Sequence, residues 1–251
     1  MRLVILLVLF VLAVPMLALT DSELDSIGRR VWQNECGGTR DGLTSWNSGE
    51  NFASLGIGHF IWYPRGVDGP FEESFPKLIA YIRKNGVTTP EWLEGDCPWA
   101  TRAQFQTDFR GKRLSELRAL LAGTIRLQSR FLALRMEDAL PKMLAAAPSG
   151  QRENIRKQFE RLAATGNGTF ALIDYVNFKG EGIKSTERYK GEGWGLLQVL
   201  GGMTGSGSGA TKEFSESAVR VLTRRVENAP PSRNETQWLP GWKNRVRAYS
   251  Q

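Results

Sequence analysis

Apolar residues recur along most of the chain at the three-to-four-residue spacing of an amphipathic helix, and one segment breaks this pattern. That segment, residues 42–63, is rich in glycine, serine and asparagine and ends in an alternating apolar pattern, which predicts a short hairpin or small sheet. One small sheet inside a helical body predicts a mostly helical α+β fold. The predicted helices cover 22–35, 71–83, 101–109, 114–147, 151–164, 169–178, 193–203, 211–228 and part of 240–249.

Capping and breaking residues set the expected ends of these helices. Ser22 is expected to cap the first helix, and the Gly37-Gly38 pair to end it. Pro141 lies inside the long segment 114–147, so we expect a kink or a break there.

The first twenty residues differ in character from the rest. A basic Arg2 precedes an apolar run over 3–19, which predicts a signal peptide at residues 1–20, or else a retained membrane anchor of barely sufficient length. Either outcome places residues 21–251 outside the cytoplasm, in the periplasm or secreted. These residues are enough for one domain, and we expect a monomer that touches a membrane only if the N-terminal segment is retained.

Charge and motifs limit the partners. The chain has 33 Lys and Arg against 26 Asp and Glu, and its net charge of +7 suits an anionic partner such as a cell-wall polymer. Basic residues are not clustered with aromatic ones, so nucleic acid is not expected. A phosphate-binding glycine loop is missing from the sequence, and the single histidine argues against a His/Cys zinc site. No cofactor or metal is therefore expected.

The two cysteines allow three interpretations. Export to an oxidising compartment would allow a disulfide between Cys36 and Cys97, which would stabilise the fold by about 4 kcal/mol in the chain-entropy model. Two buried free thiols are the alternative. A third is a cysteine-dependent hydrolase in which His59 activates Cys36.

A carboxylate offers the better candidate for catalysis. Glu35 is expected at the C-terminal end of the first helix, next to Trp32, with apolar hairpin residues folded over it. The negative end of the helix dipole and desolvation both raise the pKa of a carboxyl group. A carboxyl that stays protonated near neutral pH can act as the general acid that breaks a glycosidic bond.

The same region resembles a known family. A helix that ends in Glu35, followed by a glycine-rich hairpin and the run Ser54-Leu55-Gly56-Ile57-Gly58-His59, is similar to the active-site core of phage-type lysozymes and endolysins. The resemblance implies a lysozyme-like fold with an interlobe cleft, and peptidoglycan as substrate. It implies Glu35 as the acid, Ser54 as the residue that positions water or sugar, and His59 beside the substrate.

Further stretches add to the resemblance and to the expected substrate site. Residues 170–178, which include Asn177, are similar to the buried helix of the family, and residues 239–245 to the start of its C-terminal helix. The run from Gly193 to Gln198 resembles the Gly-Leu-Met-Gln segment of lytic transglycosylases and goose-type lysozymes. We expect Asn177, Gln198 and the aromatic Trp46 and Trp194 to bind sugar.

The chain departs from the family pattern at its second carboxylate. Ser48 stands six residues before Ser54, where the family has aspartate, and Glu50 is the nearest substitute as a base. Without a base, lytic transglycosylase chemistry remains open, because the sugar's own hydroxyl then attacks. The alternative function is a non-catalytic wall-binding or inhibitory module that kept the fold and lost the second carboxylate.

Overall fold

The computed structural model describes residues 18–251 and confirms a mostly helical α+β fold. The expected signal peptide or anchor falls almost wholly outside this range. Among residues 18–251, no helix combines the length and apolar character needed to cross a bilayer. The helices are α1 Asp21–Cys36, α2 Phe75–Lys84, α3 Arg102–Thr107, α4 Lys112–Gly123, α5 Ile125–Ala146, α6 Arg152–Ala163, α7 Gly166–Lys179, α8 Leu196–Gly201, α9 Ala210–Asn228 and α10 Leu239–Arg247.

The predicted hairpin region folds into a three-stranded antiparallel sheet in the order β1-β2-β3. Its strands are β1 Thr44–Ser45, β2 Ala53–Leu55 and β3 Phe60–Trp62, with Ser54 paired to Ser45 on one side and to Ile61 on the other. A second ribbon, β4 Arg188–Tyr189 with β5 Glu192–Gly193, was not predicted, because two-residue strands carry no readable alternation.

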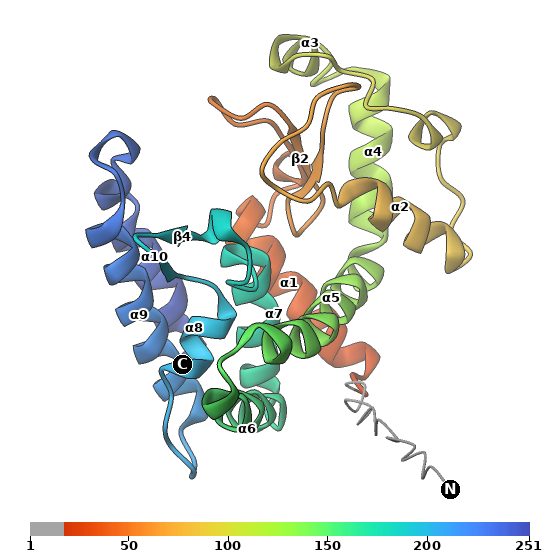
Figure 1. The fold of residues 1–251 in the computed structure, drawn as a ribbon. Coiled ribbons are helices and arrows are strands. Elements are labelled where there is room, and N and C mark those ends of the chain that lie inside the picture. Colours follow the sequence, from red (N-terminus) through yellow and green to blue (C-terminus); the bar gives the residue numbers. More distant parts are fainter. Residues whose placement is uncertain (1–17) are drawn as a thin grey trace, which may run out of the picture.

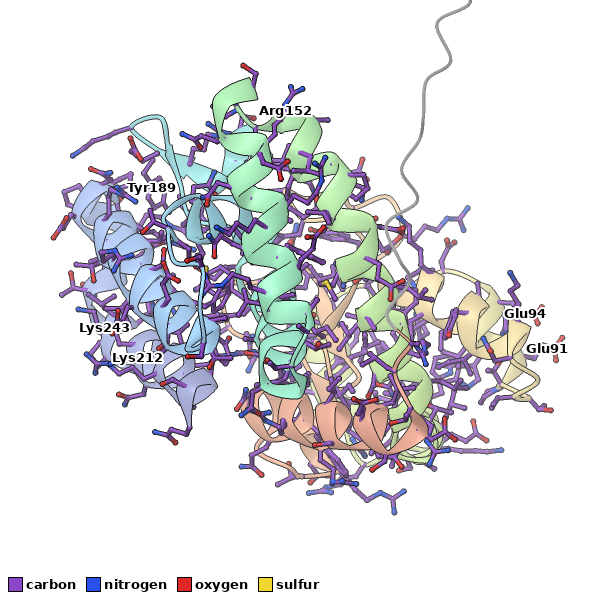
Figure 2. The ribbon with its side chains drawn as sticks, turned by 90° about the horizontal axis from the view of Figure 1, so that it is seen from below. Glu91, Glu94, Arg152, Tyr189, Lys212 and Lys243 are labelled. Carbon is purple, nitrogen blue, oxygen red and sulfur yellow. The ribbon has the colours of Figure 1, made fainter. Side chains whose placement is uncertain are left out.

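The elements form two groups joined by a pair of helices (Figure 1). The three-stranded sheet lies with α2, α3 and α4 in one group, and α6 to α10 with the β4–β5 ribbon form the other. Helices α1 and α5 pack against each other between them. In Figure 2, Tyr189 of β4 lies on the side of α9 and α10, at the opposite end of the molecule from Glu91 and Glu94.

Helix α1 starts at Asp21, and its N-cap lies two residues before the expected one. Thr20, not Ser22, is the N-cap: its hydroxyl accepts a hydrogen bond from Glu23 N, and the Glu23 carboxylate accepts one from Thr20 N. This capping box satisfies donors at both ends of the first turn. The helix ends at Cys36, directly before Gly37, as predicted.

The long predicted helix 114–147 breaks at Thr124 and not at Pro141. The Thr124 hydroxyl donates to the carbonyl of Leu120, and residues 112–123 and 125–146 form separate helices. Pro141 is exposed and stays within α5. The expectation of a break at the proline was wrong, and the signal for the true break was Gly123-Thr124.

The turn between β2 and β3 rests on the start of α5. Gly56 has a φ of +72°, and a Cβ there would lie 2.5 Å from Oε1 of the buried Gln128. That oxygen accepts a hydrogen bond of 2.9 Å from Ile57 N, while Nε2 donates to Leu121 O at 2.7 Å. One buried amide therefore links the turn to the junction of α4 and α5.

Replacement of Gln128 by leucine should lower the free energy of unfolding by about 1–3 kcal/mol, because it leaves the buried Ile57 N–H without a partner and removes one of the hydrogen bonds to Leu121 C=O. Denaturant unfolding monitored by circular dichroism measures this. Gln106→Leu, on the exposed face of α3, is the matched control and should change stability by less than about 0.5 kcal/mol. Equal effects of the two substitutions would disprove the role given to Gln128.

Candidate active site

Glu35 lies in the last turn of α1, and its side chain is 14% exposed. Oε1 accepts hydrogen bonds from Arg245 Nη2 at 2.6 Å and from Asn177 Nδ2 at 3.2 Å. Oε2 lies 3.6 Å from Nδ1 of His59. Three separate elements, α10, α7 and the β2–β3 turn, therefore meet at this one carboxylate.

A second, fully buried carboxylate anchors Arg245. Asp174 of α7 accepts hydrogen bonds from Arg245 Nε at 2.9 Å and from Arg245 Nη2 at 2.8 Å. Tyr249 donates its hydroxyl to the same carboxylate, and Asn34 donates its amide at 3.3 Å. A buried charge is tolerated when it is paired and hydrogen-bonded in this way.

The pKa shifts around this cluster follow from burial and from these charges. Burial alone would lower the pKa of Arg245, but the carboxylates of Asp174 and Glu35 raise it well above its usual value. Burial and the negative charge of Asp174 raise the pKa of Tyr249. The cluster therefore holds a permanent cation and a neutral phenol.

The motifs around Glu35 placed no cation beside it, whereas the structure places the guanidinium of Arg245 2.6 Å from its Oε1.

The run Gly56-Ile57-Gly58-His59 forms the tight turn that brings His59 to Glu35. His59 has a φ of +49°, and a Cβ at Gly58 would lie 3.1 Å from Oδ1 of Asn177. The turn is thus pressed against α7. Burial lowers the pKa of His59, the Glu35 carboxylate raises it, and Arg245 lowers it, with a net decrease.

Within residues 18–251, neither of the expected partners on the hairpin forms a hydrogen bond or ion pair with Glu35. Ser54 is buried in the middle of β2. Glu50 lies in the β1–β2 connection, at the opposite end of β2 from His59, and accepts a hydrogen bond of 3.1 Å from Asn47 Nδ2. Burial raises the pKa of Glu50, and the Asn47 hydrogen bond opposes the increase.

Two tryptophans expected to stack on sugar are core residues instead. Trp46 is 4% exposed, packs edge-on against Phe105, and donates its indole N–H to the carbonyl of Glu50. Trp194 is 6% exposed and contacts both the Tyr189 ring, at 4.5 Å, and the Arg225 guanidinium, at 4.1 Å. Neither presents a free ring face to a ligand.

Gln198 has a structural contact that the sequence analysis did not anticipate. Its Oε1 accepts from Gly195 N at 2.9 Å, and its Nε2 donates to Gly182 O at 3.0 Å. The side chain therefore closes the loop that carries β4 and β5 onto the start of α8. Binding of sugar by Gln198 remains a prediction.

The two cysteines are free and buried, so the expected disulfide is not formed. Cys36 Sγ donates to Gly56 O at 3.6 Å, while Cys97 Sγ donates to Trp99 O at the same distance. Burial and the Glu35 carboxylate raise the pKa of Cys36 to about 12, and burial raises that of Cys97 to about 11. A thiol this weakly acidic is a poor nucleophile, which argues against the cysteine-dependent alternative.

Two hollows on the molecule are lined by residues other than Glu35. One of about 160 Å³ lies between α1 and the start of α7, and one of about 460 Å³ lies between residues 62–76 and 94–97. Neither is lined by Glu35. The side chains of Glu35 and His59 are 14% and 26% exposed, so a ligand can reach the pair from solvent.

Replacement of Arg245 by methionine should lower the free energy of unfolding by about 3–5 kcal/mol, because it leaves the buried Asp174 charge unpaired. Chemical denaturation measures this, with the exposed Arg247→Met of the same helix as control. Adding Asp174→Asn to Arg245→Met should recover part of the loss. A double variant as unstable as the sum of its single variants would contradict the pairing.

His59 should make stability depend on pH. Its pKa in the folded protein lies below the ordinary value of about 6.5, so the unfolded chain binds the proton more readily. Its contribution is complete above pH 6.5 and is lost as the pH falls through the folded pKa. His59→Asn keeps a residue that tolerates positive φ, and should lose less stability between pH 7 and 5 than the wild type. If urea unfolding gave the same change of stability with pH for His59→Asn and for the wild type, this role of His59 would be ruled out.

The site unites Glu35, His59 and Asn177 of the predicted residues and adds Arg245, Asp174 and Tyr249. The sequence signal for these additions was weak: one aspartate inside an apolar helix and one arginine among several basic residues of α10. No protein-family model, curated protein or solved structure matches the chain. The geometry around Glu35 is therefore the basis for a functional assignment.

Proposed function

We propose that this protein cleaves peptidoglycan glycan strands by general-acid catalysis, with Glu35 as the acid. In this proposal the fold is lysozyme-like, and the glycan binds between the two groups of elements, where α1 ends. The observation that carries the proposal is the position of Glu35: a partly exposed carboxyl fixed by Asn177, His59 and Arg245, on the rigid end of a helix.

Arg245 has a second carboxylate partner besides Glu35. The guanidinium makes two hydrogen bonds to Asp174 and one to Glu35. In the proposed reaction, protonated Glu35 turns from Arg245 toward the glycosidic oxygen, while Arg245 stays paired with Asp174. The protonated carboxyl then donates its proton to the leaving group, the step that general-acid catalysis accelerates about 10²–10⁴-fold.

The position of Glu50 bears on the second step. Glu50 lies in the connection before β2, and His59 lies in the turn after it. The three residues of β2, roughly 10 Å of strand, separate the two segments. An inverting hydrolase needs its base roughly 6.5–9.5 Å from the acid. Glu50 is thus a weak candidate for the base, and attack by the sugar's own hydroxyl, the lytic transglycosylase reaction, needs no second carboxylate.

The charge and the N-terminal segment agree with this substrate. A net charge of +7 attracts an anionic wall polymer. The apolar run over 3–19 directs the protein to the compartment that contains the wall. No cofactor enters the proposed reaction.

Glu35→Gln should reduce the release of soluble fragments from purified peptidoglycan by about 10²–10⁴-fold, because glutamine keeps the shape but cannot donate the proton. The reduction is measured by separating the released fragments according to mass. Glu50→Gln is the matched control: little change excludes it as the base, and a comparable loss assigns it that role. Reducing ends indicate hydrolysis, and 1,6-anhydro ends indicate transglycosylation.

One outcome would replace the proposal. If the wild-type protein binds peptidoglycan in a pull-down assay and releases no fragments, the non-catalytic wall-binding or inhibitory module is correct. Ser48, which stands where the phage-type lysozymes have aspartate, favours that alternative.

A further inference from the structure

Lys179, the last residue of α7, is the cation beside the candidate active site that is not committed to a carboxylate. Its Nζ lies 3.4 Å from the centre of the Trp242 ring and 3.9 Å from that of the Phe178 ring. No ion pair within residues 18–251 includes it, whereas Arg245 pairs with Glu35 and Asp174, and Arg225 pairs with Glu235.

Phe178 places Lys179 close to the acid. The guanidinium carbon of Arg245 lies 4.1 Å from the centre of the same ring. The two cationic groups are therefore within about 8 Å of each other, since both lie within cation–π range of one ring. Arg245 in turn donates to Glu35. A ligand that reaches Glu35 is thus within reach of Lys179.

The surroundings favour an anion at this lysine. Lys179 is only partly exposed, and burial together with Arg225 and Arg245 lowers its pKa well below the usual value. Glu35 and Glu235 oppose that shift, but each already accepts hydrogen bonds from an arginine. A carboxylate bound near Nζ would stabilise the ammonium form and accept a charge-assisted hydrogen bond from it in a partly desolvated place.

We propose that Lys179, on the faces of Phe178 and Trp242, binds a carboxylate carried by the glycan beside the bond that Glu35 cleaves. The proposal rests on the proposed function and narrows the substrate class to strands without stem peptides. In those strands the lactyl group of muramic acid carries a free carboxylate, whereas in peptide-bearing strands it forms an amide. Neutral strands of the same linkage lack the partner for Lys179.

The test measures selectivity. Full-length wild-type protein, Lys179→Met, Lys179→Arg and the exposed control Lys212→Met of α9 are assayed on oligomers with free lactyl carboxylates and on the same oligomers reduced to alcohols. We expect the wild type and Lys212→Met to prefer the carboxylated oligomers at least tenfold in kcat/KM. Lys179→Met should lose this preference by slowing only on the carboxylated oligomers, and Lys179→Arg should retain most of it.

Two results with Lys179→Met would overturn the proposal. One is an unchanged preference for the carboxylated oligomers. The other is an equal loss of activity on both substrates, which would mean that Lys179 has a structural role in packing α7 against α10. If the wild type cleaves neither oligomer, the proposed function fails. Calorimetric binding of the two oligomers then tests Lys179 separately: a preference for the carboxylated one that Lys179→Met abolishes supports it, and equal binding rejects it.

Discussion

The contact between Asp174 and Arg245 is the constraint on which the arrangement around Glu35 depends. Asp174 lies with no solvent exposure in a helix that is otherwise apolar over Phe170–Ile173, and its charge requires a partner. Arg245 meets that requirement, and in doing so it fixes α10 against α7 and directs its Nη2 at Glu35. A feature of the core thus determines the surroundings of the candidate catalytic group.

Much of the fold was predictable because it depends on local physics. Helical spacing located nearly all the helices, and the glycine pair at Gly37 located the end of α1. Errors arose where two local signals competed. Pro141 is tolerated because it is exposed within α5, whereas Thr124 breaks the helix through its own backbone-directed hydroxyl.

The candidate site was predictable only in part. Glu35, His59 and Asn177 came from local motifs, and the structure brings them together. Asp174 and Arg245 are joined across 71 residues, a pairing that no local pattern reveals. Trp46 and Trp194 were misplaced because glycine-rich neighbours suggested a surface, while each ring is covered by residues distant in sequence, Phe105 and Arg225.

The separation of Glu35 and Arg245 by 210 residues has a consequence for how the protein matures. Synthesis delivers Glu35 with the first helix and Arg245 with the last, so the carboxyl emerges long before its cation. Until residue 245 arrives, the charge of Asp174 is unpaired and α7 cannot settle in the core. The fixed position of the Glu35 carboxyl is therefore among the last features of the molecule to form, and a chain cut short before α10 would keep the residues of the hairpin motif without the group that orients Glu35.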